Sequence, residues 1–277
     1  MWGQTPHGIQ CVGTDPARDT WVSYLCYTKK RMARKPRLLK EYGIYHIINR
    51  GVEKRDIFLD RQDYSRFIIG LECFNCLESI NLWSFLRLNN GHEGLQSLLK
   101  EKLQLFRSQK REPLVEILAF VLMPNHYHLI VKEIKPDGIS QFLKKMGGYS
   151  VYFNNRYNRV GPLFQSRFKS IEISDERQMG VVFNYVHANP VEIIEPGWKK
   201  FNVQDPKKAT EYICKYPWSS YPDYIGKTQN PYVTQREHYL KFLQGNQGCQ
   251  KSVEDWVVQH YQKVFHDEDT VKLFLDI

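Results

Sequence analysis

Residues 116–133 read EILAFVLMPNHYHLIVKE, two apolar runs joined by a Pro-Asn pair. Both runs have the length and the β-branched and aromatic content of strands, and Pro-Asn is a common turn dipeptide. The stretch therefore predicts a tight hairpin with strands over 114–123 and 126–133. This hairpin fixes the centre of the fold, because the segments on either side of it can be assigned around two adjacent antiparallel strands.

The segments that flank the hairpin contain further predicted strands and helices. GIYHIINR ends at a glycine and has the composition of a strand, and DRQDYSRFIIGLECF has helical spacing with an aspartate able to cap its start. The predicted elements outside the hairpin are a strand over 43–50, a helix over 60–74, a helix over 138–157, a strand over 168–174 and a helix over 175–189. The order strand–helix–strand–strand–helix–strand, followed by one more helix, predicts an α+β fold of the ferredoxin-like, split βαβ type, with an antiparallel sheet and helices on one face.

Three segments fall outside this order. Residues 1–31 lack a periodic pattern and precede Met32, so we interpret them as an N-terminal extension. Residues 77–112 are interpreted as a helical insertion, and residues 226–277 as a helical C-terminal appendage. The main domain is then expected over 32–225, with a loop-rich stretch over 191–225.

The composition is that of an ordinary globular protein with a strong basic balance. The 277 residues carry a formal net charge of +9 and a pI near 9.1. A basic surface favours a polyanionic partner, because each neutralised phosphate releases counterions, although a basic surface without such a partner is equally compatible with these numbers. No stretch is apolar enough to span a bilayer, and six scattered cysteines do not suggest a disulfide scaffold, so a cytoplasmic, non-membrane protein is expected.

His126 and His128 interrupt the second strand of the hairpin. Side chains in a strand alternate between faces, so both imidazoles should project from one face while Tyr127 projects from the other. Two imidazoles at this spacing can bind one divalent ion and leave positions for a third side chain, water and a phosphate oxygen. The alternative is that both are ordinary, half-exposed strand residues.

A further pair of polar residues lies at the end of the last predicted helix, in FNYVHANPV. Tyr185 and Asn189 are four residues apart and share a helix face. Both could face the histidines, but asparagine before proline is also a common helix stop and most tyrosines simply pack. The residues alone leave both readings open.

Five blocks together resemble the single-tyrosine HUH transposases of insertion sequences, and in particular the REP-associated tyrosine transposases. The blocks are YHIINRGVEKRDIFLDRQDYSRF, LMPNHYHLIV, YFNNRYNRVGPLFQSRFKSI, YVHANPVE and YPWSSYPDYIG, in that order over about residues 32–225. Segment 77–112 is longer than the family pattern leads us to expect between the first helix and the second strand, and segments 1–31 and 226–277 have no clear counterpart in it.

The resemblance implies a metal-dependent enzyme that cuts and rejoins single-stranded DNA beside a hairpin of the REP type, near the nucleoid. Tyr185 matches the nucleophile, which would form a 5′-phosphotyrosine intermediate. His126, His128 and Asn189 match the ligands of a metal ion, Mg²⁺ or Mn²⁺. Some relatives complete their active sites in dimers, so the resemblance leaves a homodimer open.

Basic residues are interleaved with aromatic ones in a pattern typical of single-strand binding. The residues expected to contact DNA are Arg34, Lys35, Arg37, Arg50, Lys54, Arg156, Arg159, Arg167 and Lys169. Two other functions stay open: a module that binds single strands without cutting, and a metal phosphoesterase that activates water. His46 and His187 are interpreted as ordinary packing or surface residues, and the Cys73-x-x-Cys76 pair as structural.

Overall fold

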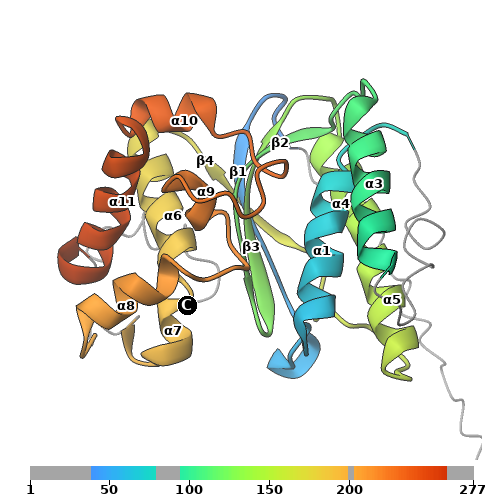
Figure 1. Cartoon of the computed structure of the whole chain (residues 1–277), viewed down its shortest axis with the longest axis horizontal. Helices are drawn as coiled ribbons and strands as arrows, with labels where there is room; N and C mark the ends of the chain where they lie inside the picture. The colour runs from blue at the N-terminus through green and yellow to red at the C-terminus, as the bar shows by residue number, and fades with distance from the viewer. Residues whose placement is uncertain (1–38, 79–93, 199–202, 261–277) are drawn as a thin grey trace, which may run out of the picture. The chain divides into compact units, whose positions relative to one another are not determined.

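The computed structural model describes residues 39–78, 94–198 and 203–260. Within these ranges, four strands form one antiparallel sheet in the order β2-β3-β1-β4 (Figure 1). The strands are β1 Ile44–Arg50, β2 Val115–Met123, β3 His126–Glu133 and β4 Lys169–Ile173. The helices are α1 Arg61–Cys73, α3 Gly94–Ser108, α4 Gly138–Met146, α5 Gly148–Arg156, α6 Glu176–Ala188, α7 Val191–Ile194, α8 Pro206–Ile213, α9 Tyr221–Tyr224, α10 Glu237–Phe242 and α11 Gly245–Asp255, with short turns of helix at Val52–Lys54 and Trp256–His260.

The hairpin predicted around Pro124-Asn125 is present. β2 and β3 pair from Val115 opposite Glu133 to Met123 opposite His126, with a bulge between Ile117 and Ala119. β1 lies between β3 and β4, as the split βαβ order requires. The α+β class and the antiparallel sheet are therefore confirmed.

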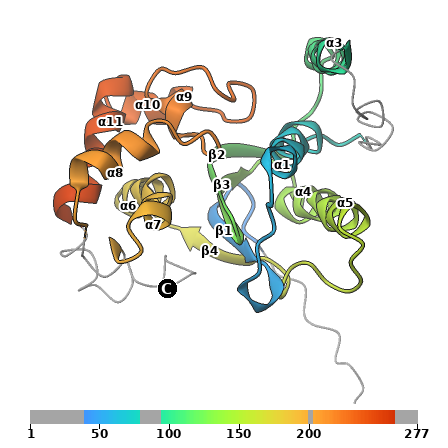
Figure 2. The ribbon, with the colours of Figure 1, turned by 60° about the horizontal axis from the view of Figure 1, so that its bottom comes forward.

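One face of the sheet packs against α1, α4 and α5, and we call it the α1 face. Its strand residues include Ile47, Phe120, Tyr127 and Leu129, which form one apolar core with residues of those helices. In Figure 2 these helices stand on one side of the sheet.

The opposite face, which we call the α6 face, is also covered. Val121 and Ile130 project from it into a second core with Val182 and Phe183 of α6. The expectation of helices on one face is therefore wrong. β2 is buried along nearly all of its length, and a strand that is apolar on both sides needs a cover on both sides.

The C-terminal helices belong to the cover of the α6 face. Cys249 and Val253 of α11 and Trp256 contribute to the same core as α6. Segment 218–220 also lies along the outer edge of β2, where the amide of Leu122 donates to the carbonyl of Trp218 at 2.8 Å. This contact protects the exposed edge of the sheet from pairing with other chains.

Two other expectations need correction. The helix predicted over 138–157 is divided into α4 and α5 at Gly147, which agrees with the low helix propensity of its Gly-Gly pair. Residues 191–225, expected to be largely loop, contain the short helices α7, α8 and α9.

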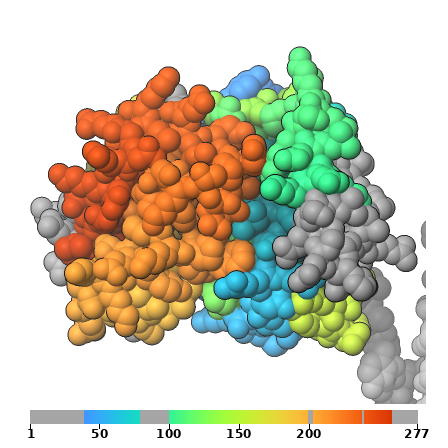
Figure 3. Space-filling model, viewed as in Figure 1, coloured from blue at the N-terminus to red at the C-terminus, as the bar shows by residue number. Residues whose placement is uncertain are grey.

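Arg107 of α3 links the insertion both to α1 and to the C-terminal segment that contains Tyr232. Arg107 of α3 makes two hydrogen bonds to the carboxylate of Glu72 in α1, at 2.5 and 2.8 Å. Its guanidinium also lies 3.7 Å from the ring centre of Tyr232. Figure 3 shows α3, in green, beside the orange C-terminal segment.

Among the described residues, no helix has both the length and the hydropathy needed to cross a membrane.

Candidate active site

A cluster of histidines lies on the α6 face, where β1 and β3 are neighbours. Ile48 is paired with His128, and His46 with Ile130, so His46 and His128 share a face at an offset of two residues. His46 Nε2 and His128 Nδ1 are 2.8 Å apart and their rings stack at 5.1 Å. Both side chains are fully buried. The two imidazoles therefore share one hydrogen bond inside the protein.

His126 has a well-defined partner at its Nδ1 atom. Asn125 Oδ1 lies 2.6 Å from this nitrogen, while Asn125 Nδ2 donates to the carbonyl of Lys54 at 3.2 Å. Because a carbonyl can only accept, the amide of Asn125 must present its oxygen to His126. In its neutral form His126 therefore carries its proton on Nδ1 and its lone pair on Nε2.

α6 brings Tyr185 against the histidines. Asp175 caps the start of this helix by accepting a hydrogen bond from the amide of Gln178, and the helix ends before Pro190. The ring of Tyr185 lies 5.7 Å from that of His128 and meets it edge-on. Tyr185 is fully buried, and Trp198 stacks on its other side at 6.2 Å.

Asn189 follows Tyr185 by one helical turn, as its spacing predicts. Its backbone amide donates to the carbonyl of Tyr185 at 3.0 Å, and its side-chain Nδ2 donates to the same oxygen at 3.4 Å. Its Oδ1 atom is buried and has no hydrogen-bond partner among the described residues. A buried amide oxygen in this state costs about 1–3 kcal/mol unless something else satisfies it.

The side chains fit a divalent cation. His126 and His128 supply imidazole nitrogens and Asn189 an amide oxygen, a donor set that suits Mn²⁺ or Mg²⁺ when water or phosphate completes it. The described residues contain no group of three or more His, Cys, Asp and Glu placed to bind a metal. Asn189 offers a buried amide oxygen as a donor of a different kind.

Residues 88–189 match the family model "Transposase IS200 like". This segment includes the two histidines of β3 and the whole of α6. A solved structure of a REP-associated tyrosine transposase bound to a REP hairpin is also similar, with 16% identity over 74% of this chain and 96% of that chain, at a TM-score of 0.42. No curated protein sequence matches the chain.

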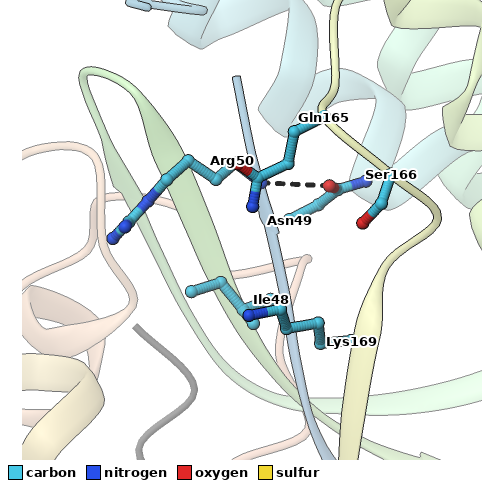
Figure 4. Close-up of a pocket in the computed structure, with 6 residues that line it drawn as sticks. All are labelled: Ile48, Asn49, Arg50, Gln165, Ser166 and Lys169. Carbon is cyan, nitrogen blue, oxygen red and sulfur yellow. Dashed lines mark hydrogen bonds between the residues drawn. The ribbon is translucent and has the colours of Figure 1, made fainter. Parts of the chain in front are cut away.

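A small polar pocket opens beside the end of β1, on the side of β4 (Figure 4). Arg50 and Lys169 bring positive charge to it, and the amides of Asn49 and Gln165 bring hydrogen-bonding groups. Arg50 is paired with His126 across β1 and β3, so the pocket adjoins the strand end that carries the histidines. Ile48 and Ser166 complete its lining.

The structure places the other predicted DNA-binding residues unequally. Lys54 and Arg167 are exposed, and Arg159 is half-buried and donates to Asn154 Oδ1 at 2.7 Å. Arg34, Lys35 and Arg37 lie outside the described residues.

Arg156 is occupied within the protein. It forms ion pairs with Asp60 at 2.6 Å and with the fully buried Asp63 at 2.7 Å. Tyr152 and Tyr157 donate to the same buried carboxylate, at 3.0 and 2.9 Å. The hydrogen bonds from Arg156 hold the pKa of Asp60 below its usual value. Arg156 therefore neutralises carboxylates on the α1 face and is not part of the DNA-binding surface proposed below.

Sequence reasoning missed His46. It was interpreted as a packing or surface residue, yet it contacts both His128 and Tyr185, whose ring centre is 6.3 Å from its own. The available signal was strand alternation: one of Tyr45 and His46 had to share the histidine face, and Tyr45 packs on the α1 face. Knowing which one required the register of β1 against β3.

Proposed function

We propose that this protein is a DNA transposase that cuts and rejoins single-stranded DNA through Tyr185. The hydroxyl oxygen of Tyr185 attacks the phosphorus of a phosphodiester. The bond between phosphorus and the 3′ oxygen breaks, and the products are a 5′-phosphotyrosine and a free 3′-OH, which takes up the proton. The observation that supports this proposal is the packing of Tyr185 directly against His128, with Asn189 one turn further along α6.

The chain's own residues would prepare the phosphate. His126, His128 and Asn189 would hold the divalent ion, which when bound polarises the phosphate and offsets the charge that builds up on it. Arg50 and Lys169, on the same side of the site, would bind neighbouring phosphates of the strand. The covalent intermediate conserves the energy of the phosphodiester bond, which joining of strands requires.

The burial of Tyr185 supports transfer over hydrolysis. A phosphotyrosine formed there is shielded from water, so the returning 3′-OH has less competition. The same burial requires that DNA displace part of the packing to reach the hydroxyl. Trp198, which stacks on the ring of Tyr185, is part of this packing.

The proposed substrate is single-stranded DNA next to a hairpin of the REP type. The net charge of +9 and the exposed cations Lys54, Arg167 and Lys169 suit a polyanion, and the pocket of Figure 4 gives its backbone a place beside the site. A duplex would not readily present a phosphodiester to a buried tyrosine, whereas an unpaired strand can bend into it.

The test is a covalent adduct on a denaturing gel, using hairpin oligonucleotides with single-stranded flanks and Mn²⁺. Wild type should form the adduct, and Tyr185→Phe should form none while still binding DNA. Tyr216→Phe is the matched control: Tyr216 is also buried and donates to the carbonyl of Leu122 at 2.7 Å, so this variant removes a buried tyrosine hydroxyl that is engaged by a main-chain carbonyl. Its adduct should persist.

Three outcomes would contradict the proposal. An adduct that survives Tyr185→Phe assigns the nucleophile to another residue. DNA binding without any adduct from wild type would favour a non-catalytic single-strand-binding module. Cleaved ends without a trapped intermediate would favour a phosphoesterase that activates water.

A further inference from the structure

We propose that His46 is a positioning residue: through its hydrogen bond to His128 it sets which nitrogen of His128 is left to bind a cation. This inference rests on the metal site in the proposed function. It starts from the contact between His46 Nε2 and His128 Nδ1, which measures 2.8 Å between two fully buried rings.

A neutral imidazole has one N–H and one lone pair, so the contact exists in only two forms. If His128 donates from Nδ1, its Nε2 atom keeps a lone pair and can bind a cation. If His46 donates from Nε2, His128 carries its own proton on Nε2 and cannot be a ligand. Metal binding by His128 therefore requires His46 to be the acceptor, with its own proton on Nδ1.

The neighbouring histidine shows the same arrangement. Asn125 Oδ1 accepts from His126 Nδ1, and the carbonyl of Lys54 fixes the direction of that amide. Each histidine of β3 thus meets a side-chain acceptor at Nδ1, from the turn in one case and from β1 in the other. Because both acceptors hold the proton on Nδ1, the Nε2 atoms of His126 and His128 are the ones left to bind a cation.

The packing around His46 makes it a rigid acceptor. Its ring stacks on His128 with only 19° between the planes, and Tyr185 meets it edge-on. A displaced His46 would therefore disturb the orientation of His128 and of the nucleophile together. Side chains that orient metal-binding histidines in this way typically contribute 10- to 100-fold to metal affinity.

Four variants of the full chain test the inference without DNA. Binding of Mn²⁺ alone is measured by the loss of the free-ion signal in electron paramagnetic resonance. His46→Phe keeps a ring but removes the acceptor and should weaken binding about 10- to 100-fold, whereas His46→Gln restores an acceptor and should recover most of it. Ile130→Val trims the residue directly opposite His46 and should leave binding unchanged, and His128→Ala gives the lower limit.

Nitrogen NMR of the metal-free protein gives a readout that a purely structural role would not change. His128 should carry its proton on Nδ1 in wild type and should populate both forms in His46→Phe. Circular dichroism establishes whether each variant is folded. If His46→Phe is unfolded, the inference is tested by Mn²⁺ binding to His46→Gln and by the nitrogen NMR spectrum of the wild-type protein.

The inference is overturned if a folded His46→Phe binds Mn²⁺ like wild type, or if wild-type His128 carries its proton on Nε2. These results would leave the tyrosine chemistry intact, because the adduct assay measures it separately. If wild type binds no Mn²⁺, the proposed metal site fails and this inference fails with it.

Discussion

The two faces of the sheet are built from the same strands but have opposite contents. On the α1 face, Tyr127 and Leu129 enter a continuous apolar core, and the buried carboxylate of Asp63 is paired with Arg156. On the α6 face, His126 and His128 alternate with those residues along β3, and His128 contacts His46 and Tyr185. The buried carboxylate of the α1 face is thus satisfied within the protein, whereas the buried Oδ1 of Asn189 on the α6 face has no hydrogen-bond partner among the described residues.

This contrast separates stability from function along a single strand. Burial of apolar area stabilises the fold wherever it occurs, so the α1 face can be apolar throughout. Burying polar groups costs free energy unless they are paired, so a polar cluster on the α6 face is expected to be retained for binding or chemistry. Substitutions at adjacent positions of β3 should therefore have different consequences.

The largest effect is expected from His128→Ala, which removes a residue of the α6 face. Loss of a metal-binding imidazole should reduce adduct formation on the order of a thousandfold, because a bound cation contributes several kcal/mol to charge stabilisation. The free energy of unfolding, measured in urea without metal, should change less than in Leu129→Ala. If His128→Ala still formed the adduct, the metal site could not be the one proposed on the α6 face.

The next effect concerns the neighbouring position on the α1 face. Leu129 is fully buried, and Leu129→Ala should lower the free energy of unfolding by about 2–5 kcal/mol through lost burial and a cavity. Adduct formation at a temperature where the variant is folded should stay within about threefold of wild type, given that Leu129 faces away from the histidines. Selective loss of the adduct in a folded Leu129→Ala would show that the two faces are coupled.

The sequence predicted the hairpin, the order of the sheet and the separation of His126 and His128 from Tyr127, because these follow from strand alternation and turn chemistry. It did not predict that α6 and the C-terminal helices cover the α6 face, since apolar runs show burial but not what covers each side. His46 was missed for a related reason. Its contact with His128 depends on strand register, which is a long-range property of the fold.

The cations illustrate another limit of sequence reasoning. Arg156 and Arg167 stand in one basic and aromatic stretch and look equivalent there, yet Arg156 pairs with carboxylates while Arg167 is exposed. The carboxylate partners are more than ninety residues away in the chain. Only folding brings them together, so sequence pattern could not separate the two arginines.

Arg156→Ala should lower the free energy of unfolding. The change leaves the buried carboxylate of Asp63 without its cation, so we expect a loss of about 2–3 kcal/mol in the free energy of unfolding at pH 7. Arg167→Ala is the matched control and should change this quantity by less than about 0.5 kcal/mol. Urea unfolding of both variants measures the difference.

The effect of Arg156→Ala should also depend on pH. The pKa of Asp60 is lowered in the folded protein, chiefly by its hydrogen bond from Arg156, so this contribution is present above the unfolded value of about 3.9 and is lost as the pH falls below it. The difference between wild type and Arg156→Ala should therefore shrink below about pH 3.9. A difference that grew in acid would show that Arg156 does not stabilise the ionised carboxylate.

The smallest effect is expected from Lys169→Ala at the pocket beside the histidines. Lys169 is exposed and begins β4, so its loss should leave the free energy of unfolding nearly unchanged. If it contacts one phosphate, the affinity for single-stranded hairpin DNA should fall a few-fold, and the slope of log K against log salt should decrease by about 0.7. Fluorescence anisotropy over a series of salt concentrations measures both, with Lys215→Ala as an exposed control on the segment after α8. An unchanged salt slope would place the path of the DNA away from β4 and would limit the functional surface of the α6 face to the histidines and α6 itself.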